Sequence, residues 1–139
     1  MPFLIWKPEY SVNIERIDAQ HKHLVSLLKR LHEAIAEDSK YRVKHDAVGD
    51  ILGELIDYTK YHFSTEESLL RAYQYPHYEN HRKQHNDLKE QVYQLQEDFI
   101  LGSATVSYEM LTFLNEWVEN HILGSDKQFS DFLNAKGVF

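Results

Sequence analysis

Histidine is the residue of this sequence with the clearest capacity for chemistry. The chain holds nine histidines but only five glycines in 139 residues, and it has no cysteine. An imidazole can transfer a proton or bind a transition metal. The absence of cysteine excludes disulfides, thiolate zinc sites, iron–sulfur clusters and a cysteine nucleophile, and it is typical of a reducing compartment.

Five of the histidines continue the apolar stripes of predicted helices. His21 lies three residues before Leu24, and His62 lies seven residues after Leu55, so both imidazoles share a helix face with leucines. Glu66 follows His62 by four residues and lies on the same face. The others are His81 and His85, which extend the stripe of Leu88, Val92, Leu95 and Phe99, and His121, four residues after Trp117.

The convergence of these side chains favours a metal site. One histidine on an apolar face is usually a hydrogen-bonded core residue, and two histidines four apart arise by chance in a histidine-rich chain. Five imidazoles buried together with a carboxylate, however, would destabilise the fold by many kcal/mol if they lacked partners. Neutral imidazoles and ionised carboxylates form a ligand set for a metal.

The remaining candidates differ in how they lie relative to these stripes. Asp126 lies five residues after His121, which is about 140° away on a regular helix. Gly124 and Ser125 lie between them and could form a bulge that turns Asp126 inward. The four other histidines are expected outside the site: His23 and His45 in solvent, His32 in a structural role, and His77 beside Pro76, although it continues the spacing of His81 and His85.

The positions of the prolines and the spacing of the apolar residues together predict the helices that position these side chains. Prolines occur only at positions 2, 8 and 76, and no alternating β pattern is sustained over a strand length. We expect an irregular N-terminal arm over 1–17 and a first helix from Ala19, capped by Asp18. Further helices are expected over about 43–72, 77–101, from about 107, and in a short C-terminal segment over 126–133. The first stripe consists of Leu24, Leu27, Leu28, Leu31 and Ile35, the second of Val48, Ile51, Leu52, Leu55 and Leu69, and the fourth of Met110, Leu114 and Trp117.

This pattern predicts an all-α fold, an up-down-up-down antiparallel four-helix bundle over about 19–123. Gly49 and Gly53 lie four residues apart on one helix face, and we expect a closely packed helix beside them. Apolar residues make up 42% of the chain and charged residues 27%, which is ordinary for one globular domain over 1–139.

Charge and hydropathy exclude two classes of partner. The net charge is −7 and no basic tract occurs, so no nucleic-acid partner is expected. No apolar stretch approaches the ~18 residues of a membrane helix, so no membrane insertion is expected. The apolar start of the chain has no basic segment and no small-residue cleavage site, so it does not resemble a signal peptide. We therefore expect a cytoplasmic protein and a monomer.

Several motifs of this chain resemble those of the hemerythrin family in its bacterial single-domain form. They are Trp6, Ile17-Asp18-Ala19-Gln20-His21, His62-Phe63-Ser64-Thr65-Glu66-Glu67, Tyr75-Pro76, His81-x-x-x-His85, and Trp117-Val118-Glu119-Asn120-His121 continuing to Asp126. All seven family ligand positions are present without substitution. The family has the four-helix bundle fold, of which myohemerythrin is a standard example.

The resemblance implies two non-haem irons and reversible binding of dioxygen. It assigns one iron to His81, His85 and His121 and the other to His21 and His62. Glu66 and Asp126 would bridge the irons together with a solvent-derived oxo or hydroxo group. It also implies that Asp126 is a ligand and that His77 is not.

A count of ligands leaves room for dioxygen in such a centre. Two octahedral irons have twelve coordination positions, of which this ligand set fills eleven, so one position stays open on the iron with two histidines. Apolar walls of an oxygen pocket are expected within one helical turn of the ligands, and such walls discourage water entry. The candidates are Leu24, Phe63, Trp117 and Val118, which also pack the core.

The chemistry favours oxygen binding over oxidation. Ferritin-like di-iron enzymes have more carboxylates and fewer histidines, and extra anionic ligands stabilise high-valent iron. We therefore expect an oxygen carrier, storage or delivery protein, not an enzyme, with an oxygen-consuming enzyme as a possible recipient. Two alternatives stay open: an oxygen or nitric oxide sensor acting on a separate partner, and a di-iron oxidase or peroxidase. A zinc hydrolase is disfavoured, because seven ligands suit two metals.

Overall fold

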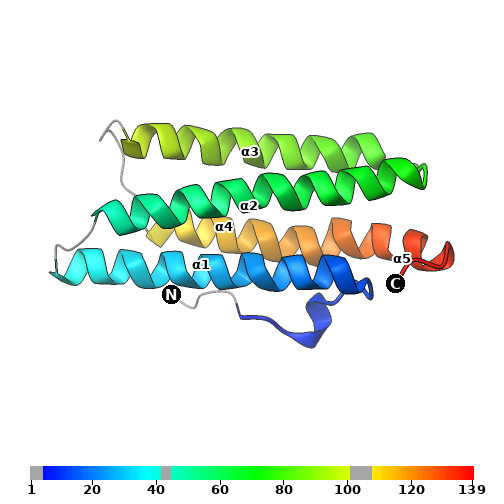
Figure 1. The fold of residues 1–139 in the computed structure, drawn as a ribbon, viewed down its shortest axis with the longest axis horizontal. Helices are drawn as coiled ribbons and strands as arrows, with labels where there is room; N and C mark the ends of the chain where they lie inside the picture. Colours follow the sequence, from blue (N-terminus) through cyan, green and yellow to red (C-terminus); the bar gives the residue numbers. More distant parts are fainter. Residues whose placement is uncertain (1–4, 42–44, 101–107) are drawn as a thin grey trace.

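The computed structural model describes residues 5–41, 45–100 and 108–139 as a bundle of four long helices (Figure 1). The elements are η1 (Pro8–Tyr10), α1 (Glu15–Tyr41), α2 (His45–Ala72), α3 (Tyr78–Ile100), α4 (Tyr108–His121), η2 (Ile122–Asp126) and α5 (Lys127–Ala135). Successive long helices run in opposite directions, and the described residues contain no strand. The predicted all-α bundle is confirmed.

The start of α1 differs from the prediction, because Asp18 is not its cap. The helix begins at Glu15, and the amide of Asp18 already donates to Ile14 O at 2.9 Å. The Asp18 carboxylate instead accepts hydrogen bonds from Ser11 Oγ at 2.6 Å and from the amide of Val12 at 2.8 Å. An aspartate in the first turn is favoured there by the helix dipole, and this one ties the N-terminal arm to α1.

The turn between α2 and α3 ends α2 where the sequence predicts. α2 ends at Ala72, and Gln74 adopts a φ of 56°, which allows Tyr75 N to donate to Leu70 O at 2.9 Å. α3 begins at Tyr78, one residue after the predicted start. The predicted boundaries at 43, 101 and 107 lie outside the described residues.

A π-helical turn, η2, interrupts the last helical segment at Gly124, as the predicted bulge requires. The amide of Lys127 contacts Ile122 O, five residues earlier, which is the hydrogen bond of a π-helix. Because this turn is wider than an α-helical turn, residues five apart come to one face. Asp126 therefore joins His121, and α5 begins after it at Lys127.

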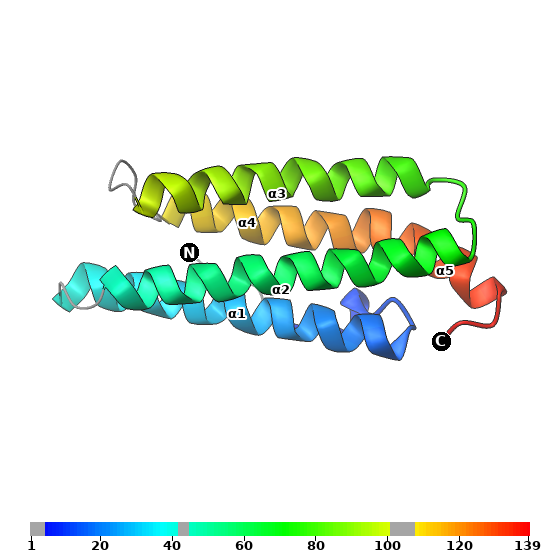
Figure 2. The same ribbon diagram turned by 45° about the horizontal axis from the view of Figure 1, so that its top comes forward.

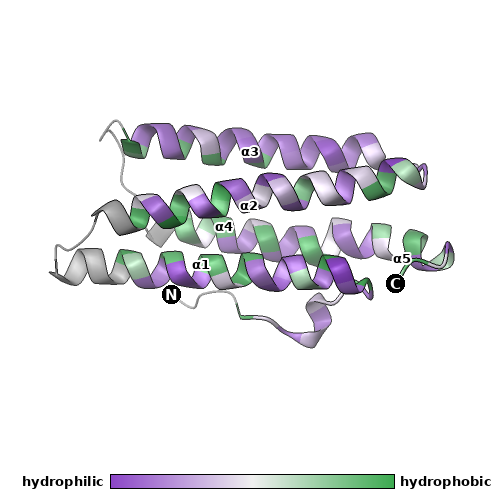
Figure 3. Ribbon diagram, in the orientation of Figure 1, coloured by the Kyte–Doolittle hydropathy of each residue, from purple (hydrophilic) through white to green (hydrophobic). Residues whose placement is uncertain are grey.

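The buried apolar residues form two clusters, one in the bundle and one at its end. The bundle cluster contains the predicted stripes of α1 and α3, and Figure 3 shows hydrophilic residues along the outer side of α3. Of the predicted α2 stripe, Val48, Leu52 and Leu55 are buried and Ile51 is partly buried. The prediction of Leu69 is wrong by one residue, because Leu70 is the fully buried neighbour and Leu69 packs only partly buried against the end cluster. The end cluster comprises Val12, Ile14, Ile17, Leu70, Tyr75, Phe129 and Leu133.

A close approach between α2 and α3 explains one of the two α2 glycines. A Cβ at Gly49 would lie 3.0 Å from Cε1 of Phe99, so the predicted close neighbour is confirmed there. A Cβ at Gly53 would lie 3.7 Å from Nε2 of Gln96, an ordinary contact. Within the described part of the chain, no helix has the length and apolar character needed to cross a membrane.

Candidate metal centre

Seven polar side chains form a layer between the two apolar clusters. On α1, His21 lies between Ile17 of the end cluster and Leu24 of the bundle cluster, and Asp126 lies between Ile122 of the bundle cluster and Phe129 of the end cluster. The elements α1 to α4 and η2 all contribute. The layer consists of His21, His62, Glu66, His81, His85, His121 and Asp126, each of them buried. The structure thus brings together all seven ligand candidates of the sequence.

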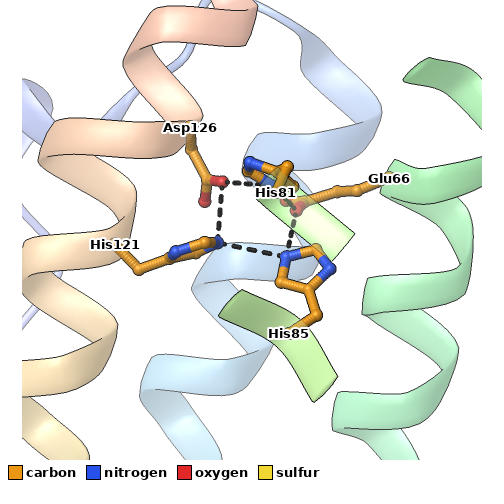
Figure 4. A group of neighbouring side chains, drawn as sticks. All are labelled: Glu66, His81, His85, His121 and Asp126. Atoms are coloured by element: carbon orange, nitrogen blue, oxygen red, sulfur yellow. Dashed lines mark hydrogen bonds and ion pairs between the residues drawn. The ribbon is translucent and has the colours of Figure 1, made fainter. Parts of the chain in front are cut away.

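Five of these residues form a three-histidine group, in which one potential ligand atom from each lies within 4.8 Å of the others. The group comprises Glu66, His81, His85, His121 and Asp126 (Figure 4). The Nε2 atoms of His85 and His121 are 3.1 Å apart. Glu66 Oε1 lies 3.1 Å from Nε2 of His81, and Asp126 Oδ1 lies 3.2 Å from Nε2 of His121.

A two-histidine group uses the other oxygens of the same two carboxylates. It comprises His21, His62, Glu66 and Asp126. Glu66 Oε2 lies 2.9 Å from Nε2 of His62, and Asp126 Oδ2 lies 3.1 Å from Nε2 of His21. Each carboxylate therefore presents one oxygen to each group. This is the arrangement of a bridging carboxylate between two cations.

Outer hydrogen bonds orient two of the imidazoles. Nδ1–H of His62 donates to Oε1 of Gln20 at 2.7 Å, and Nδ1–H of His85 donates to Oε2 of Glu67 at 2.9 Å. With the proton on Nδ1, each ring directs the lone pair of Nε2 into the layer. One ring is thus oriented by a neutral amide and the other by a carboxylate.

The hydrogen-bonding groups of the layer are not all satisfied by one another, and two cations would supply the missing partners. Neither oxygen of Asp126 accepts a hydrogen bond of good geometry from the described residues. His85 offers a lone pair towards the Nε2 of His121, where a donor or a cation is required. Five imidazoles and two carboxylates are a nitrogen and oxygen donor set suited to iron or a related transition metal.

The pKa shifts in the layer also indicate that its two carboxylates attract positive charge. Burial lowers the pKa of His21 and of His81, but the facing Asp126 and Glu66 outweigh it and raise these pKa values to about 10 and about 9. Burial keeps the pKa of His62 below its usual value, so its contact with Glu66 is not a salt bridge. Burial opposes ionisation of Glu66 and Asp126, yet the surrounding imidazoles hold both pKa values well below normal. Metal ions would displace the protons of His21 and His81.

An apolar cavity of about 30 Å³, the site cavity, adjoins the layer, where it is lined by His21 and His62 of the two-histidine group, His121 of the three-histidine group and the shared Asp126. Its wall includes all four pocket candidates of the sequence, Leu24, Phe63, Trp117 and Val118. The Phe63 ring stacks on His85 with centroids 3.7 Å apart, and the Trp117 ring stacks on His121 at 4.4 Å. Further wall residues are Leu28, Leu55, Ile56, Thr59, Leu88, Val92, Leu114 and Ile122.

The other histidines lie apart from the layer where the structure describes them. His23 is exposed, with its ring 4.2 Å from that of Tyr58, and His77 is exposed beside Tyr75. Both predictions are confirmed. His32 is half-buried on α1. The side chain of His45 lies outside the described part of the chain.

Comparison with known proteins now places the fold and the layer in a family. The model of the hemerythrin HHE cation binding domain matches residues 12–133. The chain belongs to the hemerythrin family. This confirms the resemblance seen in its motifs, and the family model's description as a cation binding domain agrees with the donor set of the layer.

Similar hemerythrins cover almost the whole chain. The bacteriohemerythrin of Stenotrophomonas maltophilia is 33% identical over 135 residues, covering 97% of this chain and 84% of that protein. The myohemerythrin of Theromyzon tessulatum is 27% identical over 124 residues, covering 89% and 88%. A solved wild-type hemerythrin superposes with a TM-score of 0.87 at 28% identity, covering 94% of this chain and 97% of that one.

Proposed function

We propose that this hemerythrin binds dioxygen reversibly at a non-haem di-iron centre. The observation that carries the proposal is the pair of shared carboxylates, each with one oxygen toward either histidine group, beside an apolar cavity. The bacteriohemerythrin and myohemerythrin relatives support it. In this proposal the protein carries, stores or delivers oxygen in the cytoplasm, with an oxygen-consuming enzyme as recipient.

The seven residues would divide between two irons as the two groups divide. His81, His85 and His121 would hold one iron, and His21 and His62 the other. Glu66 and Asp126 would bridge them, with an oxo or hydroxo group as third bridge. When bound, the iron pair supplies an open position and two electrons for dioxygen.

The protein's own residues keep the site cavity small and dry. Leu24, Phe63 and Val118 line it with apolar atoms, and apolar walls exclude water. The hydroxyl of Thr59 donates its proton to Leu55 O at 2.7 Å, so that proton is already engaged. Apolar walls and an engaged Thr59 proton slow the loss of bound oxygen in reduced form.

The size and donor set of the site favour binding over catalysis. A cavity of about 30 Å³ has room for a diatomic ligand, since a single water needs about 10–15 Å³ by the same measure. A cavity of this size favours a small ligand over a large organic substrate. Five imidazoles and two carboxylates also provide less anionic charge than the carboxylate-rich ligand sets of ferritin-like di-iron proteins.

The visible spectrum tests the proposal. The anaerobically reduced, iron-loaded protein is expected to gain an absorption band on exposure to oxygen and to lose it under argon, over repeated cycles. Sustained oxygen consumption with an added reductant would support the oxidase alternative instead. Failure to regain the reduced spectrum would also contradict the carrier function.

A second prediction concerns the carboxylate behind His85. Burial opposes ionisation of Glu67, but its hydrogen bond with His85 lowers the pKa of Glu67 below the usual value, so it is charged at neutral pH. Glu67→Gln keeps an acceptor and removes the charge, which makes His85 a weaker ligand. We expect iron affinity to fall by about 10- to 100-fold in chelator competition. The exposed Glu116→Gln on α4 is the matched control, and equal affinities of the two variants would contradict this role.

A further inference from the structure

A second cavity lies between α3 and α4, farther from the metal centre. This outer cavity has a volume of about 150 Å³ and is lined by Gln91, Val92, Leu95, Met110, Phe113 and Leu114. Figure 2 shows α3 and α4 running side by side. The backbones of α3 and α4 come close along less of their length than those of the other neighbouring helix pairs in the described residues. The wider spacing leaves the space that the cavity occupies.

Two residues, Val92 and Leu114, line both cavities. On α3, the site cavity is bounded by Leu88 and Val92, and the outer cavity continues one turn further to Leu95. His85 and Val92 are seven residues apart on this helix, which is about 10 Å. The two cavities therefore follow one another along a single seam of the bundle, with the side chains of Val92 and Leu114 between them.

The outer cavity reaches the surface of the protein. Gln91 is exposed, and Phe113 exposes 38% of its surface although it is a large apolar residue. Among the wall residues that the structure describes, all except Gln91 are apolar. A small apolar gas can enter such a space from water, whereas ions gain nothing there to replace their hydration.

We propose that dioxygen reaches the di-iron centre through the outer cavity and passes between Val92 and Leu114. The inference rests on the proposed function, because it names the route of the same ligand. A competing route would pass Trp117 and Val118, which are both half-buried. On that side the Trp117 ring covers His121 in a stack with an interplanar angle of 18°.

Xenon tests the outer cavity as a gas site without any oxygen chemistry. Xenon occupies dry apolar cavities of about this size. In crystals of the iron-loaded protein under xenon pressure, we expect a xenon atom in the outer cavity, and none in Val92→Phe. Xenon elsewhere in the crystal but absent from the wild-type outer cavity would overturn the proposal.

Oxygen kinetics test the route itself. We expect Leu95→Phe, at a buried position that lines only the outer cavity, to slow association and release of dioxygen by about 10-fold each, a barrier increase of about 1.4 kcal/mol. A barrier on the route changes both rates and preserves their ratio, whereas a perturbed binding pocket changes the ratio. Leu114→Ala is expected to accelerate both rates. Its matched control is Leu111→Ala, a fully buried position on the same helix that lines neither cavity.

The outcomes separate the route from the function. If dioxygen binds reversibly but Leu95→Phe and Leu114→Ala leave both rates at wild-type values, the route is wrong and the carrier function stands. If Val118→Phe slows both rates and Leu95→Phe does not, oxygen enters past Trp117 and the proposal is overturned. A wild-type protein that binds no dioxygen contradicts the proposed function itself, and the xenon result then still decides the gas site.

Discussion

Asp126→Ala is expected to release both irons from the loaded protein. One oxygen of Asp126 lies 3.2 Å from Nε2 of His121 in the three-histidine group, and the other lies 3.1 Å from Nε2 of His21 in the two-histidine group. Removing the carboxylate takes a ligand from each group at once. Iron analysis after desalting should fall from two irons per chain to nearly none.

The control for this experiment is His23, which lies two residues from His21 on a different face of α1. His23→Ala removes an exposed imidazole two residues from His21 and should retain two irons per chain. His21→Ala, at a fully buried position, should lose iron. Two retained irons in Asp126→Ala would mean that this carboxylate does not bridge, and equal loss in His23→Ala and His21→Ala would contradict the position of the centre.

Removing the metal is expected to cost the protein much of its stability. Without cations, the buried Asp126 oxygens have no hydrogen bonds of good geometry, and the two ionised carboxylates share the layer with only imidazole protons. Each unsatisfied buried polar group costs about 1–3 kcal/mol. Several such groups should lower the melting temperature by more than about 10 °C, measured by calorimetry on the iron-loaded and chelated forms.

A variant that cannot hold iron makes this test specific. Asp126→Asn keeps the shape of the side chain but loses the charge needed to bridge two cations, so it should melt at one temperature with or without added iron. If the wild-type protein also melted at one temperature in both states, its layer would be satisfied without metal.

The sequence predicts the polar layer well because helical phase alone determines which face a residue occupies. His81 and His85 lie on the stripe that Leu88 begins, and the structure buries all three. Asp126 is the informative case: Gly124 and Ser125 predict that a bulge can form, and the structure has a π-helical turn over Ile122–Asp126 that brings Asp126 to the face of His121. Asp18 shows the opposite effect, since its local cap signal is overridden by hydrogen bonds to the N-terminal arm.

Other parts of the site could not be predicted from periodicity. Gln20 and Glu67 adjoin ligand positions in the chain, but their contacts with His62 and His85 depend on the rotamers of side chains from different helices. The spacing of residues in the sequence does not predict the two cavities either. Val92 and Leu114 have the spacing of ordinary core residues, and only the distance between α3 and α4 leaves space beside them.

The amount of oxygen taken up tests the central claim most directly. The reduced protein, with its iron content measured, is titrated with oxygenated buffer in a sealed oxygen electrode and then purged with argon. We predict uptake of one dioxygen per two irons and its return on purging, cycle after cycle. Uptake that continues beyond this ratio when reductant is present, or no uptake by protein that holds two irons per chain, would contradict the account.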